Sequence, residues 1–209
     1  ECVQWMMESN LKIWILTFDR PEVLNRLVYK LGQQGHKACI FSNHPEVKID
    51  QRVSPYVERV LINSLNTAES NSWCARSWNS MLIQAFNDGN QEAVMIQDDT
   101  DINPGFMQWL NLQKHSYDFI SGPAGDQFYY IHLNVLRKVG WWDERYIGCY
   151  CGDADYFARV LQNYDNNRVS IQESHNWGLN HNTCGLSNFI NTEMNVKAID
   201  PNYSNQHWQ

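Results

Sequence analysis

Residues 11–18, LKIWILTF, form a near-continuous apolar run of strand length. Such a run suits a strand that is buried on both faces, as in a parallel sheet, since a half-exposed strand would alternate with polar residues. The next segment, DRPEVLNRLVYKLGQQG, has apolar residues at helical spacing, and Pro21 suits the first position of a helix. A second apolar strand, KACIFSN at 37–43, follows. Residues 11–43 therefore predict a β-α-β unit.

The alternation of strands and helices continues along the chain. Strands are expected at 57–63, 92–96, 117–121, 128–133 and 168–171. Helices are expected at 70–89, 104–115, 134–140 and 153–163. The segment from His175 onward is polar and rich in Asn, with little periodicity. No repeat or linker interrupts this order, so the 209 residues are expected to form one α/β domain with an irregular C-terminal segment.

Charge and composition argue against several classes of protein. The net charge is −7 and the pI is about 5.4, whereas a general nucleic-acid binder needs a basic surface. No apolar run reaches the length of about 18 residues that suggests a membrane-spanning helix. The six cysteines show neither a CxxC pair nor zinc-finger spacing. We therefore expect mostly free thiols and a reducing, cytoplasmic compartment.

An acidic run, Asp98-Asp99-Thr100-Asp101, follows the apolar residues of the strand expected at 92–96. Like charges repel, and burying them is costly unless a cation lies nearby. One interpretation is a site for Mg²⁺ or Mn²⁺, which take carboxylate oxygens and often substrate phosphates. A second is a calcium loop, but Pro104 occupies the place of the required glycine. A third is a solvated turn that caps the helix expected from Pro104. The run alone leaves these interpretations open.

Four segments, in order over residues 11–163, resemble the GT-A glycosyltransferases. NVLRKVGWWDERYIGCYCGDADYFARVLQN resembles the acceptor-side signature, in which a short helix and an Asp-Glu turn lead to a Gly-Asp-x-Asp helix start. ILTFDRPEVLNRLVYKL resembles the first strand and helix, where a Thr-x-(Asn/Asp)-Arg-Pro turn borders the nucleotide pocket. SWCARSWNSMLIQAF resembles the Ala-Arg-x-x-Asn helix that precedes the metal strand. The acidic run with DINPGF resembles the DxD segment.

The resemblance implies a GT-A fold over 1–209, which is a Rossmann-like mixed sheet flanked by helices. Residues 11–103 would form the nucleotide-binding half and 104–209 the acceptor-binding half. The implied activity moves a sugar from a nucleoside diphosphate sugar to a hydroxyl of a glycan or glycoprotein acceptor, with UDP favoured as the carrier. Mn²⁺ or Mg²⁺ would neutralise the leaving diphosphate. Being small and without an anchor, the chain resembles bacterial or large-DNA-virus transferases more than Golgi enzymes.

Two other functions compete with this one. A non-catalytic carbohydrate-binding module would use its tryptophans for sugar and its acidic turn for calcium, and it would not bind nucleotides. A nucleotidyltransferase usually has a glycine-rich N-terminal loop, which TFDRPEVLNR lacks.

The resemblance also implies roles on the donor side. Asp99 is the first choice for a direct metal ligand, Asp101 the second, and His175 a further ligand from the C-terminal segment. Helix capping is the structural alternative for Asp19, and a surface position is the alternative for Arg76. The residues expected to border the nucleotide sugar are Thr17, Asp19, Arg20, Arg76 and Asp98, with Asp98 meeting the ribose.

On the acceptor side, Asp153 is the expected general base, with Asp155 as the alternative. An inverting transferase needs a carboxylate that takes the proton of the acceptor hydroxyl. A helix start favours the ionised form of such a group, although Asp153 could also serve only as a cap. Trp141 and Trp142 would stack on the sugar, unless they are core aromatic residues.

Overall fold

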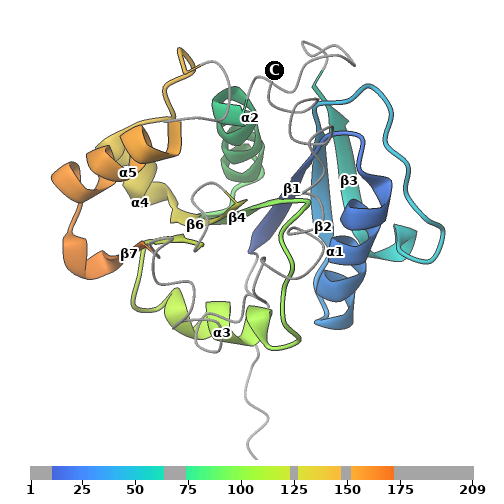
Figure 1. Cartoon of the computed structure of the whole chain (residues 1–209). Coiled ribbons are helices and arrows are strands. Elements are labelled where there is room, and N and C mark those ends of the chain that lie inside the picture. The colour runs from blue at the N-terminus through green and yellow to red at the C-terminus, as the bar shows by residue number, and fades with distance from the viewer. Residues whose placement is uncertain (1–10, 64–73, 123–126, 147–151, 172–209) are drawn as a thin grey trace, which may run out of the picture.

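The computed structural model describes residues 11–63, 74–122, 127–146 and 152–171. They form a seven-stranded sheet with the order β3-β2-β1-β4-β6-β5-β7, covered by helices (Figure 1). The strands are β1 (Lys12–Thr17), β2 (Ala38–Ser42), β3 (Val57–Ile62), β4 (Glu92–Gln97), β5 (Phe119–Ser121), β6 (Phe128–His132) and β7 (Val169–Ile171). The α-helices are α1 (Pro21–Gln33), α2 (Cys74–Asn87), α3 (Phe106–Gln113), α4 (Leu133–Val139) and α5 (Gly152–Asn163).

The sheet is mixed, as the resemblance to GT-A glycosyltransferases implied. Strands β1 to β4 are parallel to one another, β6 is antiparallel to β4 and β5, and β7 is parallel to β5. The six strands other than β6 therefore point in one direction, and their carboxyl ends lie at the same edge of the sheet.

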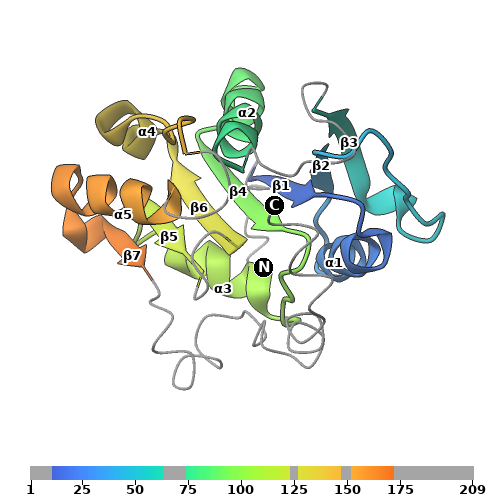
Figure 2. The same ribbon diagram turned by 45° about the horizontal axis from the view of Figure 1, so that its top comes forward.

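Two apolar cores lie on the two faces of the sheet, because side chains alternate along each strand. Ile13 and Ile15 of β1 pack in the first core with α1 and α3, whereas Trp14 and Leu16 pack in the second with α2, α4 and α5. Figure 2 shows α1 and α3 on one side of the sheet and α2 and α4 on the other. This double burial explains why β1 is apolar at nearly every position.

The element boundaries agree closely with the sequence pattern. Pro21 begins α1, as expected, whereas α3 begins at Phe106 rather than at Pro104. Among the described residues, no helix is long and apolar enough to span a membrane. Cys39 and Cys74 are buried free thiols, and the other four cysteines lie outside the described residues. The compartment stays a prediction.

Candidate functional site

The direction of the strands brings the predicted site residues to one edge of the sheet. Thr17 ends β1, and the acidic run follows β4, which is the neighbour of β1. Helices α2 and α5 lead into β4 and β7, so their first turns, with Arg76 and Asp153, lie toward the same edge. In open α/β sheets, ligands bind at this carboxyl edge. The topology therefore groups residues that are far apart in the sequence.

The acidic run is buried and lies against an arginine. Asp98 is fully buried, and its Oδ2 accepts a hydrogen bond of 2.6 Å from the Thr17 hydroxyl. Arg20 forms ion pairs with both Asp98 and Asp99, with 2.8 Å between Arg20 Nη1 and Asp99 Oδ2. A solvated turn therefore does not describe this run. Whether Asp98 also meets a ribose stays a prediction.

Asp101 points to a different partner. It forms an ion pair with Lys30 of α1, and its Oδ1 also accepts a hydrogen bond of 3.1 Å from the Ile102 N–H. The N-cap of α3 is Gly105, which has no side-chain cap, so the acidic run does not cap this helix. The position of Asp101 is thus set by α1 and by its own backbone.

One carboxylate oxygen of Asp99 has no hydrogen-bond partner among the described residues. The Asp99 side chain is 13 % exposed, and this oxygen, Oδ1, is buried. Among the described residues, Arg20 pairs with Asp98 and Asp99, and Lys30 pairs with Asp101. Because an unpaired buried acceptor is costly, Asp99 Oδ1 is a suitable place for a further cation.

The residues present fit a metal that takes only one or two protein ligands. No group of three or more His, Cys, Asp or Glu side chains within the described ranges could hold a metal by itself. Mg²⁺ and Mn²⁺ commonly bind through one or two carboxylates and complete their shell with substrate phosphates and water. Asp99 Oδ1 is the atom that suits this arrangement.

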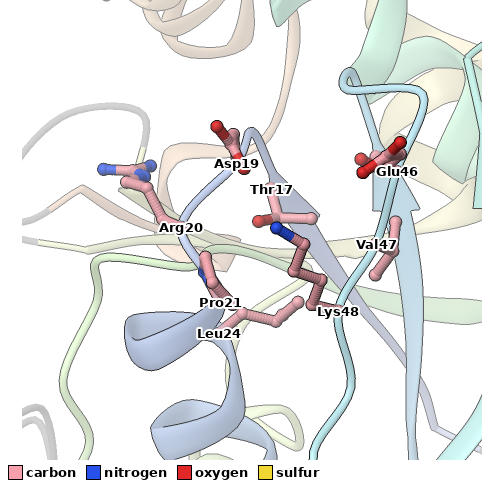
Figure 3. A pocket seen from close by; sticks show the side chains of 9 residues that line it. Thr17, Asp19, Arg20, Pro21, Leu24, Glu46, Val47 and Lys48 are labelled. Carbon is pink, nitrogen blue, oxygen red and sulfur yellow. The ribbon is translucent and has the colours of Figure 1, made fainter.

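A narrow cleft opens beside the acidic run, between the β1–α1 turn and the segment after β2 (Figure 3). Asp19 adopts a positive φ of 45°, which is uncommon for a residue other than glycine. The N-cap position belongs to Arg20, so Asp19 does not cap α1. The cleft is lined by Thr17, Asp19, Arg20, Pro21, Leu24, Ser42, Glu46, Val47 and Lys48.

Sequence reasoning missed Glu46, Val47 and Lys48, since they lie in a segment without periodicity. The signal that could have found them is their place directly after the second strand of a β-α-β unit. The carboxyl end of that strand reaches the same edge as Thr17, because β1 and β2 are parallel neighbours.

Helix α2 holds the turn that carries the predicted acceptor residues. The Asn79 side chain is buried, accepts a hydrogen bond of 3.0 Å from the Trp142 N–H, and donates one of 2.9 Å to the Trp142 carbonyl. Asn79 and Arg76 also donate to Glu144, over 3.0 and 3.1 Å. The resemblance pointed to the Arg-x-x-Asn spacing, but not to this contact with Glu144.

The two neighbouring tryptophans lie in different environments. Trp142 is 3 % exposed and stacks on Tyr156 of α5, with ring centroids 3.5 Å apart, so its ring belongs to the core. Trp141 is 45 % exposed, and its carbonyl accepts a hydrogen bond of 3.0 Å from Arg159. Only Trp141 therefore offers a ring to a ligand in this arrangement.

The two candidate bases also differ. Asp155 Oδ2 forms an ion pair with Arg159 one turn later in α5, at 2.8 Å. Asp153 Oδ1 accepts a hydrogen bond of 2.8 Å from the Ala154 N–H and forms no ion pair with the described residues. Asp153 is thus the carboxylate without a cationic partner. His175 lies outside the described residues, so its predicted metal contact stays a prediction.

No family model and no curated protein matches the chain, but solved structures do. S. aureus TarS, residues 1–349, matches with a TM-score of 0.54 and 11% identity, over 77% of this chain and 57% of that one. The mannosyltransferase PcManGT from Pyrobaculum calidifontis, in complex with GDP-Man and Mn²⁺, matches with a TM-score of 0.51 and 9% identity, over 78% and 55%. The chain thus spans less than two thirds of either structure. These are GT-A glycosyltransferases, and the GT-A fold is confirmed.

Proposed function

We propose that this chain is a glycosyltransferase that moves a sugar from a nucleoside diphosphate sugar to a hydroxyl of a glycan or glycoprotein acceptor. The observation that carries the proposal is the acidic run: it lies at the carboxyl edge, beside a cleft, and Asp99 Oδ1 is buried there without a hydrogen-bond partner among the described residues. The GT-A fold supports the same activity. UDP is the carrier that the resemblance favours.

Asp99 would hold Mn²⁺ or Mg²⁺ through Oδ1, since this oxygen is buried and has no hydrogen-bond partner among the described residues. The bound ion would act as a Lewis acid that neutralises the leaving diphosphate. The Mn²⁺ in the GDP-Man complex of the mannosyltransferase supports the use of a divalent ion. Asp101 is less suited to a direct contact, because Lys30 and the Ile102 N–H already engage its Oδ1.

Asp98 and Arg20 would fix the positions of the residues that bind the donor. Thr17 and Arg20 engage the buried Asp98 carboxylate, which fixes the β1–α1 turn against the end of β4. Arg20 would thereby hold Asp99 in position through its second ion pair. A preorganised site of this kind does not need to rearrange when the donor binds.

Asp153 would act as the general base in an inverting transfer. It would take the proton of the acceptor hydroxyl while that oxygen bonds to the sugar C1 and the bond from C1 to the diphosphate breaks. Arg159 already pairs with Asp155, whereas Asp153 has no cationic partner among the described residues. The exposed ring of Trp141 would stack on the acceptor sugar.

Calorimetric titration of UDP and GDP, with Mn²⁺ and with EDTA, tests the donor site. We expect nucleotide binding only with metal, for the wild type and for Asp101→Asn. Asp99→Asn should lose the metal-dependent binding. An Asp99→Asn variant that binds as the wild type does would refute the ligand assignment. Absence of binding to any nucleotide would instead favour the carbohydrate-binding module.

Asp153→Asn tests the catalytic side separately. The variant should bind metal and nucleotide as the wild type does, because no hydrogen bond or ion pair joins Asp153 to the acidic run among the described residues. Its turnover should fall by about 10²–10⁴, which is the usual contribution of a general base. Transfer at the wild-type rate would show that another group takes the proton.

A further inference from the structure

A groove of about 520 Å³, the α4–α5 groove, lies at the opposite edge of the sheet from the acidic run. Its walls come from α4 and from the end of α5, which lie side by side in Figure 1. Its floor includes Asp118, which precedes β5, and Arg168, which precedes β7. Both strands run in the same direction as β4. The groove is therefore at the amino edge, whereas the acidic run follows β4 at the carboxyl edge.

The floor of the groove is an ion pair within a hydrogen-bond network. Arg168 donates to the Asp118 carboxylate through Nε and Nη2, over 3.2 and 2.6 Å. Arg168 Nη1 donates to the His115 carbonyl over 3.0 Å, and the Tyr164 hydroxyl donates to Asp118 Oδ2 over 2.8 Å. The charges of Asp118 and Arg168 compensate each other, so these groups shape the groove without making it strongly charged.

Two cations on the α4 wall, Arg137 and Lys138, are exposed and form no ion pair with the described residues. Arg137 Nη1 donates one long hydrogen bond, of 3.4 Å, to Oδ1 of Asn134, which lies one turn earlier on the same face of α4. The Lys138 ammonium makes no hydrogen bond within the described ranges. The donors of both side chains are thus available to a ligand in the groove.

One carboxylate, Asp165, faces the groove from the other wall. Its Oδ1 accepts hydrogen bonds of 3.0 and 3.1 Å from the N–H and the Nδ2 of Asn167, which caps a short 3₁₀-helix. With Asp118 and Arg168 paired, the described lining carries two cations against this one carboxylate. The groove is therefore locally positive in a chain whose net charge is −7, and a local positive surface attracts anions.

The donors of the α4 wall suit a phosphate group. A guanidinium offers five N–H donors in a planar fork that matches phosphate geometry, and an ammonium offers three donors. A phosphate monoester has a charge of about −1.5 to −2 and three strong acceptor oxygens, so two adjacent cations match it better than they match a singly charged carboxylate. The Asn134 amide adds a neutral donor to the same wall.

We propose that the α4–α5 groove binds a phosphate dianion through Arg137 and Lys138. The phosphate is either free or carried by a small organic molecule, for which the groove has room, since small-molecule sites typically measure about 300–1,000 Å³. The proposal is independent of the proposed function, because the groove shares no lining residue with the acidic run or with the cleft beside it.

Titration of isotope-labelled protein, followed by NMR through the backbone amide signals, tests the site. EDTA excludes metal-dependent binding, and a constant ionic strength excludes general salt effects. Inorganic phosphate should shift the signals of residues 134–138 and 163–168 saturably, whereas glucose should not. Tighter binding of glucose 6-phosphate than of phosphate would identify an organic phosphate as the ligand, and equal or weaker binding would identify free phosphate.

Two double variants with the same change in net charge locate the phosphate. Arg137→Met with Lys138→Met should weaken its binding at least about tenfold, since charge-assisted hydrogen bonds are lost. Lys37→Met with Lys48→Met removes two exposed cations outside the groove and should bind phosphate as the wild type does. Lys48 lines the cleft beside the acidic run, so this control also excludes phosphate binding in that cleft.

Three results would overturn the proposal. Absence of saturable shifts in the wild type would leave the two cations with only their favourable interaction with the carboxyl end of α4. Unchanged binding by the Arg137 and Lys138 variant would place the phosphate elsewhere, and an equal loss in both double variants would show an effect of net charge alone. None of these results affects the transferase proposal, which metal-dependent nucleotide binding tests.

Discussion

Replacing Arg20 by methionine should destabilise the fold strongly, because this arginine is the cationic partner of a buried carboxylate. The Arg20 side chain is 14% exposed, and Asp98 is fully buried. Without the guanidinium, the buried Asp98 carboxylate would lose its cationic partner Arg20 and keep the hydrogen bond from Thr17. Removing one partner of a buried ion pair typically costs about 3–5 kcal/mol. We expect Arg20→Met to lower the free energy of unfolding by about 3 kcal/mol, from a total of about 5–15 kcal/mol for a typical protein.

Urea titration, followed by both tryptophan fluorescence and circular dichroism, measures this effect. Coincident transitions by the two probes are needed before a free energy is assigned. The double variant Arg20→Met with Asp98→Asn should recover most of the loss, since the charge that lacks a partner is then absent. If Arg20→Met alone unfolds within about 0.5 kcal/mol of the wild type, as a surface substitution does, the ion pair does not hold the turn.

Two further predictions concern other parts of the fold. Trp142→Ala should lower the free energy of unfolding by about 3–5 kcal/mol, because the ring is buried against Tyr156. Trp141→Ala should change this free energy by less than about 0.5 kcal/mol, because the ring is exposed, but it should raise the KM for the acceptor. Urea unfolding measures the first effect and transfer kinetics the second. Burial favours a higher pKa for Asp118, but hydrogen bonds from Arg168 and Tyr164 outweigh it and hold the pKa below its ordinary value. The stability that this pKa shift contributes is present above the unfolded pKa of about 4 and is lost as the pH falls through the folded pKa. Asp118→Asn should therefore be less stable than the wild type at pH 7. Unfolding measured across pH should show the difference in free energy between the two proteins disappearing below about pH 4.

Local pattern was sufficient to predict most elements of the fold. The apolar run of β1 reflects burial on both faces, and Pro21 with the spacing of α1 fixes the first crossover. The strand before the acidic run was also evident, because the apolar residues end where the carboxylates begin. These features depend on neighbours in the sequence.

Contacts between distant segments could not be predicted in this way. The antiparallel insertion of β6 between β4 and β5 decides the order of the sheet, but no local pattern of β6 encodes it. The ion pair of Arg20 with Asp98 joins the ends of β1 and β4, which become neighbours only in the sheet. Trp141 and Trp142 are identical and adjacent in the sequence, so only the packing on Tyr156 distinguishes them.

The predicted division into a nucleotide half, 11–103, and an acceptor half, 104–209, stays a prediction about function, because the packing is continuous across it. The core on the α2 face joins Trp78 of the first half with Trp142 and Tyr156 of the second, and the core on the α1 face joins β1 with α3. Asn79 of the first half also binds the backbone of Trp142. Separating the halves would expose both cores to water, so neither half should fold alone. The residues proposed for the donor and for the acceptor therefore share one packed support, which suits a transfer whose two reactants must be held in fixed relative positions.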